Sequence, residues 1–263
     1  MGTKIHSTAV VENKAELGEN VSVGPHSFIE NGAVIGDNTE IGSSVWVTGY
    51  ARIGRGNKIY HGASIGGPPQ DLKFKDEPTT AELGDRNLVR EFVTIHRGSQ
   101  ASKRTIIGNE NLIMAYVHIA HDCRIGDNII LANSTNFGGH CEVGDFAILG
   151  GMVPIHQFCR IGDYAMVGTG ARITQDIVPY ALVGADPTRI VGINRVGLTR
   201  RNFSEETRTA LKHAFRMIFY SKMLLSEAVV AVKEIYSNNP EIRNLVEFIA
   251  SSQRGILLKS RKD

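Results

Sequence analysis

The chain has 263 residues, of which 42% are hydrophobic and 21% are charged, and this is enough for one or two domains with a buried core. Its 29 basic and 27 acidic residues leave a net charge of +2, which excludes a strongly basic protein, so we expect no nucleic-acid partner. No run of about 18 apolar residues occurs, and residues 1–6 do not resemble a secretion signal. We therefore expect no membrane span and a cytoplasmic location.

Large apolar residues recur at a spacing of six residues between Ile5 and Ile173, with few exceptions. Of the 29 positions at this spacing, 26 hold Ile, Leu, Val or Phe, whereas chance would place an apolar residue at about 12 of them in a chain of this composition. The exceptions are Asp71, Glu77 and Ala101. A period of six matches neither an amphipathic helix nor an alternating strand. It is typical of a parallel β-helix, in which each repeat forms one wall of a coil.

Beyond residue 178 the six-residue period ends and helical patterns begin. Ser204 is predicted to cap a helix, because the apolar residues after it have the i, i+3, i+4 spacing. We expect a second helix from Ser226 and a third from Pro240, since proline favours the first helical turn.

This change of pattern divides the chain into a predicted β-helix domain over residues 1–190 and a helical domain over residues 191–263. The helical tail is predicted to run from about residue 196 to residue 258. Because the open ends of a β-helix must be covered, we expect this tail to cap the prism or to form a contact in a trimer.

Two interruptions of the period, at residues 66–82 and 96–106, predict loops that leave the walls of the β-helix. Counting regular walls in threes places one wall residue from each of six successive coils on the same face as both loops. These wall residues are Ile65, Ile95, Ile119, Phe137, Ile155 and Ile173.

Five of the nine histidines fall beside this face, and the first loop adds the acid Asp71 and the base Lys73. The five are His96, His118, His121, His140 and His156. Imidazoles near carboxylates suit general acid–base catalysis near neutral pH. They also suit a zinc site, which stays open as an alternative.

Three cysteines lie 18 residues apart, at the inward-pointing fifth position of their repeats, and are predicted to stack as small core residues. They are Cys123, Cys141 and Cys159.

Several motifs together resemble one family, the UDP-N-acetylglucosamine acyltransferases that begin bacterial lipid A synthesis. The similarity covers nearly the whole chain. The motifs are Gln70-Asp71-Leu72-Lys73, Thr94-Ile95-His96-Arg97-Gly98, His118-Ile119-Ala120-His121-Asp122-Cys123, Ile155-His156-Gln157-Phe158-Cys159 and the tail segment from Gly192 to Arg201. The resemblance implies a mainly β fold, a left-handed parallel β-helix of hexapeptide repeats with a C-terminal α-helical domain. It also implies a homotrimer with active sites between neighbouring subunits.

The activity implied by this resemblance is transfer of an (R)-3-hydroxyacyl chain from acyl carrier protein to the 3-position of UDP-N-acetylglucosamine. His121 would act as general base, Asp122 would orient it, and the backbone N–H of Gly139 would face the developing oxyanion. No metal and no cofactor are implied. The substrate-binding site would be lined by Gln70, Asp71, Lys73, His118, His140, His156 and Gln157. The nucleotide would be reached by Asn194, Arg200 and Arg201, and Thr169 would form the floor of the acyl groove.

One departure from the family pattern leaves alternatives open. Where the family often has Asn-Ile-Glu-Gly, this chain has Val196 in place of the glutamate, so a 3-amino sugar nucleotide is an alternative acceptor. A γ-type carbonic anhydrase, with zinc on three histidines, and a non-catalytic scaffold are further alternatives. The acyltransferase that N-acylates the next lipid A intermediate would carry a uridine-binding domain before the repeats, and a ladder that begins at Ile5 leaves no room for one.

Overall fold

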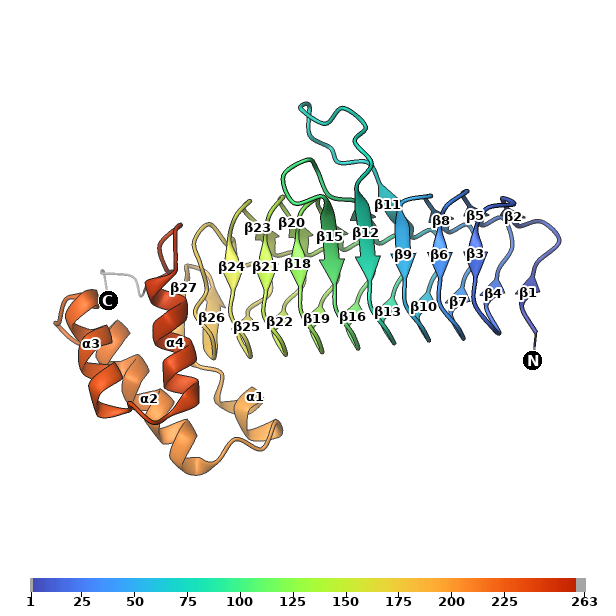
Figure 1. Cartoon of the computed structure of the whole chain (residues 1–263). Coiled ribbons are helices and arrows are strands. Elements are labelled where there is room, and N and C mark those ends of the chain that lie inside the picture. Colours follow the sequence, from blue (N-terminus) through green and yellow to red (C-terminus); the bar gives the residue numbers. More distant parts are fainter. Residues whose placement is uncertain (1, 259–263) are drawn as a thin grey trace.

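A computed structural model describes residues 2–258 and has the form of a long prism with helices at one end (Figure 1). Most strands are two residues long, and up to β25 (Met166–Val167) each of three parallel sheets takes every third strand along the chain. The last two strands, β26 (Ala181–Ala185) and β27 (Thr188–Ile193), form an antiparallel hairpin at the end of one sheet. In Figure 1 the strands of the front sheet run downward and the chain returns behind them while advancing from right to left. This makes the coil left-handed, so the predicted fold class is confirmed.

The three sheets are called A, B and C here, in the order in which the chain first enters them. Sheet A contains β1 (Lys4–Ile5), β4 (Ser22–Val23), β7 (Glu40–Ile41), β10 (Lys58–Ile59), β13 (Leu88–Val89), β16 (Leu112–Ile113), β19 (Ile130–Leu131), β22 (Ile148–Leu149), β25 (Met166–Val167), β26 (Ala181–Ala185) and β27 (Thr188–Ile193). Sheet B contains β2 (Val10–Val11), β5 (Phe28–Ile29), β8 (Trp46–Val47), β11 (Ser64–Gly67), β14 (Thr94–His96), β17 (His118–Ile119), β20 (Asn136–Phe137) and β23 (Pro154–Ile155). Sheet C contains β3 (Glu16–Leu17), β6 (Val34–Ile35), β9 (Ala51–Ile53), β12 (Thr80–Leu83), β15 (Arg104–Ile107), β18 (Arg124–Ile125), β21 (Glu142–Val143) and β24 (Arg160–Ile161).

The six-residue period arises because each two-residue strand is followed by a four-residue corner. The second strand residue points inward, and Ile65, Ile95 and Ile119 of sheet B are fully buried. Their Cα atoms pair in register from coil to coil, and Ile155 bridges Ile173 in the same direction, so the predicted common face is confirmed.

The three cysteines lie inside the prism, as predicted, and all are free and buried. The Sγ of Cys123 donates to the carbonyl of Gly138 at 3.3 Å. Burial raises the pKa of the Cys159 thiol to about 11. Because the thiolate is the reactive form, these thiols are packing residues of the core.

Both predicted loops leave the corner between sheets B and C, and Figure 1 shows them rising from the same edge of the prism. They are shorter than expected, because β12 and β15 pair over four residues, from Thr80 beside Arg104 to Leu83 beside Ile107. The first loop therefore spans residues 68–79 and the second residues 97–103. We call them loop 68–79 and loop 97–103.

The helices cover the C-terminal end of the prism (Figure 1). They are α1 (Arg195–Arg200), α2 (Glu205–Tyr220), α3 (Leu225–Ile235) and α4 (Pro240–Ala250). Ser204 caps α2 and Asn239 caps α4, each through a side-chain oxygen that accepts a backbone N–H, while α3 begins one residue before the expected Ser226. Within residues 2–258 no helix is both long and apolar enough to cross a bilayer.

The last described segment differs from the expected continuation of helix to residue 258. Helix α4 ends at Ala250, and Ile256 then forms a parallel bridge with Asp176 at the edge of the prism. The Asp176 side chain accepts from the backbone N–H of Arg160 at 2.8 Å and from the hydroxyl of Ser252 at 2.7 Å. An extended backbone thus completes this edge, since a helix cannot pair with a strand. The predicted domain boundary at residue 190 lies inside β27 and stays a prediction.

Candidate active site

Two imidazoles and one carboxylate meet at the corner between sheets B and C. The Nδ1 atom of His121 lies 2.7 Å from Oδ2 of Asp122, and Nε2 of His140 lies 3.6 Å from the same oxygen. The two rings meet edge to face with centroids 5.2 Å apart. The side chain of Asp122 is completely buried, and that of His121 is 15% exposed. We call His121, Asp122 and His140 the histidine corner.

The Asp122 carboxylate is held in its ionised form. Its Oδ1 atom accepts the backbone N–H of Ser99 at 2.9 Å and also the hydroxyl of Ser102. Burial alone would raise the pKa of Asp122, but the hydrogen bonds from His121, Ser102 and Ser99 outweigh it and hold this pKa well below its usual range. An ionised carboxylate only accepts hydrogen bonds, so Nδ1 of His121 carries a proton, and in the neutral imidazole Nε2 is the nitrogen with the free lone pair. The predicted orienting contact between Asp122 and His121 is therefore present.

The free Nε2 of His121 lies against the next coil, at Gly139. A Cβ atom at position 139 would come within 2.7 Å of that nitrogen, closer than real Cβ atoms approach. A side chain at position 139 would therefore push the imidazole of His121 out of its place. Within residues 2–258 the backbone N–H of Gly139 donates to no other group, so it is available beside the imidazole.

Two further histidines lie beside the histidine corner, His118 on β17 of the same coil as His121 and His96 on β14 of the coil before. The Nδ1 atom of His118 lies 2.7 Å from the hydroxyl of Thr94, and its ring meets that of His96 edge to face at 4.7 Å. His96 is 8% exposed, and its Nδ1 atom has no hydrogen-bond partner within residues 2–258. Burial, with the nearby His118 and His121, lowers the pKa of His96 to about 4, and burial likewise lowers the pKa of His118. Both rings are neutral at pH 7.

The coil beyond the corner presents His156, Gln157 and an aromatic residue that the sequence analysis missed. Phe158 stacks on His140 with ring centroids 4.6 Å apart and planes 8° from parallel. The exposed His156 has Nδ1 at 3.1 Å from the backbone oxygen of Gln157. Phe158 could have been found from the sequence, because the repeat places it at the same corner position as His140, one coil further on.

Loop 68–79 acts on the same corner. Burial lowers the pKa of His140, and the charges of Asp122 and of Asp71 from this loop oppose that shift. Asp71 therefore lies close enough to the histidine corner to influence it, as the sequence predicted.

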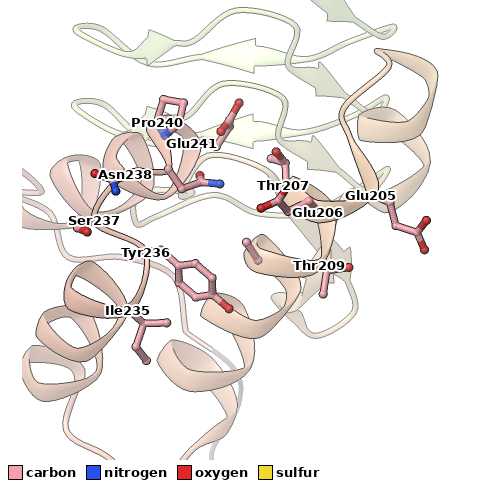
Figure 2. Close-up of a pocket in the computed structure, with 12 residues that line it drawn as sticks. Glu205, Glu206, Thr207, Thr209, Ile235, Tyr236, Ser237, Asn238, Pro240 and Glu241 are labelled. Carbon is pink, nitrogen blue, oxygen red and sulfur yellow. The ribbon is translucent and has the colours of Figure 1, made fainter.

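A hollow of about 620 Å³ opens beside His140 and Phe158 and continues toward the C-terminal segment. Its basic lining comes from Arg160 and Arg254, neither of which was predicted from the sequence. A second hollow, of about 710 Å³, lies between the starts of α2 and α4 (Figure 2). Its lining includes three glutamates and Tyr236, but it contains none of the residues that the sequence predicts for the site. The hollow beside His140 is therefore the one that adjoins the candidate site.

The predicted nucleotide residues occupy a different corner of the prism. Arg201 lies over the ring of Phe146, 4.4 Å from its centroid, at the corner between sheets C and A. The buried Asn194 caps α1, because its Oδ1 accepts the N–H of Gly197 and its Nδ2 donates to the carbonyl of Tyr164. Arg200 is exposed at the end of α1. One chain therefore does not bring Asn194, Arg200 and Arg201 together with His121, and their predicted contact with nucleotide stays a prediction.

Thr169 is exposed at the third corner, between sheets A and B. It lies directly over Gly150 of the coil before, since a Cβ at position 150 would come within 2.5 Å of the Thr169 nitrogen. The predicted acyl-groove floor and the histidine corner thus lie at opposite edges of sheet B in one chain.

The histidine corner is also the place where a metal ion could be held. One ligand atom from each of His121, Asp122 and His140 lies within 4.8 Å of the others. The Asp122 carboxylate, however, already accepts from His121, Ser99 and Ser102. These side chains can support proton transfer through His121 as they stand. A metal ion bound here would have to displace the contact between His121 and Asp122.

Known proteins share both the sequence and the fold. Residues 176–257 match the family described as UDP N-acetylglucosamine O-acyltransferase, domain 2, and residues 14–49 and 104–139 match the bacterial transferase hexapeptide repeats. The acyl-(acyl-carrier-protein)–UDP-N-acetylglucosamine O-acyltransferase of Thermodesulfovibrio yellowstonii is 45% identical over 96% of this chain and 98% of its own length. The chain belongs to this acyltransferase family.

The same family name is carried by a protein of Paraburkholderia xenovorans that is 49% identical over 97% of this chain and 99% of its own. Among solved structures, the UDP-N-acetylglucosamine acyltransferase of Bacteroides fragilis superposes with a TM-score of 0.94 at 45% identity, over 96% of this chain and 99% of its own. That of Francisella novicida superposes with a TM-score of 0.95 at 38% identity, over 98% and 95%. The predicted resemblance to these acyltransferases is confirmed, and it favours acyl transfer over the carbonic anhydrase and scaffold alternatives.

Proposed function

We propose that the protein transfers an (R)-3-hydroxyacyl chain from acyl carrier protein to the 3-position of UDP-N-acetylglucosamine, the first step of lipid A biosynthesis. The observation that carries this proposal is the hydrogen-bonded pair of His121 and Asp122, with the free Nε2 of His121 beside Gly139. Membership of the acyltransferase family supports the substrates.

The reaction begins when Nε2 of His121 accepts the proton of the sugar 3-hydroxyl while its oxygen attacks the thioester carbonyl. Negative charge moves to the carbonyl oxygen, where the N–H of Gly139 donates a hydrogen bond to it. The tetrahedral intermediate then collapses, the C–S bond breaks, and the thiolate of acyl carrier protein receives the proton from His121. Asp122 stabilises the imidazolium between these two transfers, because it remains ionised.

Substrate recognition is assigned to the residues around this pair. We infer that Gln70, Asp71, Lys73, His118, His140, His156 and Gln157 line the substrate. Asn194, Arg200 and Arg201 are inferred to serve the nucleotide, since the guanidinium fork of arginine suits a diphosphate.

We further infer that the working form is a homotrimer. His121, Arg201 and Thr169 occupy three different corners of one prism. An acyl chain that contacts Thr169 and a nucleotide sugar that contacts Arg201 could meet at His121 only where corners of neighbouring chains come together. This arrangement supports an active site between subunits, as the family resemblance implies.

Val196 bears on which atom of the sugar accepts the acyl chain. Val196 is exposed on α1, beside the proposed nucleotide residues, where the family often has a glutamate. An apolar side chain cannot accept a hydrogen bond from the sugar nucleotide. A 3-amino sugar nucleotide, which would give an amide product, is therefore kept as the second candidate acceptor.

Mass spectrometry of the product tests both candidates. Purified protein is given 3-hydroxyacyl thioesters of acyl carrier protein together with UDP-N-acetylglucosamine or its 3-amino analogue, and the His121→Ala variant serves as the control. We expect an ester product with the natural sugar that the variant does not make. Amide product alone would assign the second candidate, and no product from either acceptor would contradict acyl transfer.

A further inference from the structure

Loop 68–79, which carries Gln70, Asp71 and Lys73, is tied to the prism at both of its ends by the same dipeptide. The backbone N–H of Arg97 donates to the carbonyl of Gly67 at 2.9 Å, just before the loop begins. At the other end, the N–H of Gly98 donates to the carbonyl of Thr80 at 3.0 Å, and the hydroxyl of Thr79 donates to the carbonyl of Gly98 at 2.5 Å. Arg97 and Gly98 therefore fix the two stems of the loop.

The side chain of Arg97 adds a third attachment, in the middle of the loop. Its guanidinium donates to the carboxylate of Asp76 and lies over the ring of Phe74, 5.1 Å from the centroid. It also lies over Tyr50, 3.9 Å from the centroid, and Tyr50 belongs to the corner between β8 and β9, two coils before Arg97. One cation thus bridges a wall of the prism and two residues of the loop.

Burying this cation is costly, so its position calls for an explanation. The Arg97 side chain is 5% exposed, whereas its partner Asp76 is 82% exposed, and Nε of Arg97 has no hydrogen-bond partner within residues 2–258. Only the cation of this pair is buried, and a charged side chain taken out of water is often no more stabilising than an apolar one of the same volume. What arginine provides is geometry, because its planar guanidinium can contact rings while it donates hydrogen bonds in a fixed direction.

The part of the loop fixed in this way is a turn that displays Asp71 and Lys73. The N–H of Lys73 donates to the carboxylate of Asp71 at 3.0 Å, and the N–H of Phe74 donates to the Asp71 carbonyl at 2.9 Å. Phe74, the last residue of this turn, is the one whose ring contacts Arg97. The position of Arg97 therefore determines where Asp71 and Lys73 stand relative to the histidine corner.

We propose that Arg97 is a positioning residue for acyl transfer, which holds the turn from Gln70 to Phe74 where Asp71 and Lys73 meet the substrate. This inference rests on the proposed function. It assigns Arg97 no contact with the reacting atoms, and its effect on turnover passes through the loop.

The kinetic test is a double-mutant cycle between Arg97→Met and Lys73→Met. Methionine keeps the apolar volume of arginine but removes its charge and its hydrogen bonds. We expect each single variant to lower kcat/KM at least tenfold. In the Arg97→Met background, where the turn is already displaced, we expect adding Lys73→Met to lower kcat/KM by less than a further threefold. Arg52→Met is the matched control, since the guanidinium of Arg52 lies at the same edge of the prism but donates to the carbonyls of Gly32, Gly49 and Ala51, none of which belongs to loop 68–79. We expect this variant to keep kcat/KM within twofold of wild type. Losses that multiply fully, or an unchanged kcat/KM in Arg97→Met, would overturn the proposal.

A second readout does not depend on activity. Trypsin can cut the loop after Lys73 and Lys75, and we expect at least tenfold faster nicking there in Arg97→Met than in wild type or Arg52→Met. If Arg97→Met does not fold, Asp76→Asn gives the same comparison at an exposed residue, with an expected increase of at least threefold. Wild-type nicking rates in these variants would refute the anchoring. A wild-type protein that transfers no acyl group would instead refute the proposed function, while the nicking rates still decide the role of Arg97.

Discussion

The imidazole of His121 lies so close to the backbone of Gly139 that a single added methyl group would overlap it. A Cβ atom at position 139 would lie 2.5 Å from Cε1 and 2.7 Å from Nε2 of that ring. Asp122 holds the opposite nitrogen at 2.7 Å. The proposed base is therefore fixed from one side by a buried carboxylate and from the other by the main chain of the next coil.

We expect His121→Ala to reduce turnover by about 10²- to 10⁴-fold, the range that a positioned general base contributes. The fold should be retained, because Asp122 keeps its hydrogen bonds from Ser99 and Ser102. Turnover and oligomer mass are measured on the same sample, with His213→Ala on α2 as the control. Activity within a few-fold of wild type in an intact oligomer would end the assignment of His121 as base.

His96 predicts a pH-dependent contribution to stability. Its pKa is lowered to about 4 by burial and by nearby His118 and His121, while an unfolded histidine titrates near 6.5. Between these two values the unfolded chain binds a proton that the folded chain does not. Stability is therefore complete above about pH 6.5 and falls as the pH drops toward 4, by about 3 kcal/mol in total.

The measurement for His96 is the free energy of unfolding from pH 7 to pH 4 at a fixed protein concentration. We expect His96→Gln to lose less stability than wild type over this range, because it has no proton to gain. His156→Gln replaces an exposed histidine at the same edge of the prism, and we expect its free energy of unfolding to change with pH as that of wild type does. Parallel curves for wild type and His96→Gln would show that the buried ring does not control this dependence.

Extensive dialysis against a strong chelator should leave both activity and melting temperature unchanged. The physical reason is that the Asp122 carboxylate is already occupied by donors from His121, Ser99 and Ser102. Metal content is measured before and after dialysis, and excess zinc is then added back. A loss of activity that zinc restores would assign the histidine corner to a metal.

Arg201→Ala should raise KM for the nucleotide sugar about tenfold or more and change KM for the acyl donor far less. A charge-assisted hydrogen bond to phosphate contributes about 1.5–3 kcal/mol, and only one of the two substrates brings the diphosphate. Arg195→Ala, on the same helix, is the control. An equal rise for both substrates would indicate instead that Arg201 serves the fold through its contact with Phe146.

Thr169→Gly is predicted to shift the preferred acyl donor toward longer chains with little loss of total activity. The branched side chain of threonine is stiff at χ1 and cannot easily turn away from a groove. Each methylene that gains burial is worth about 0.8 kcal/mol, close to a four-fold preference. Competition among 3-hydroxyacyl donors of graded length is measured for both proteins, and identical length profiles would mean that another residue sets the limit.

The walls of the β-helix could be predicted from sequence because each coil repeats the same local packing. Counting repeats in threes placed Ile119 and Ile155 on one sheet, and the same count placed His118 and His121 beside that sheet. The loops carry no such period, so their ends were misjudged, and Arg97 gave no sign that it is buried. Its burial depends on Tyr50 and Phe74, which meet only in the folded chain.

The end of the helical domain was mispredicted for a related reason. Residues 251–258 follow an amphipathic helix, and the sequence analysis passed over Gly255, a residue that commonly ends helices and that has a φ of +75° here. Their extended form is set by Asp176, which is 80 residues earlier and offers Ile256 an unpaired strand edge. A local glycine can indicate that the helix ends, but no local pattern shows which strand edge the following residues will pair with.

The bridge between Asp176 and Ile256 also bears on how the protein is made. The coils of the prism can form one after another as the chain leaves the ribosome, because each coil pairs with the one before it. The last edge stays open until the segment around Ile256 has emerged. During that interval Asp176 and the strand beside it expose unpaired backbone, which is the feature that lets nascent β-proteins associate with one another. Translation through α2, α3 and α4 therefore sets the time for which the newly formed prism remains open to such encounters.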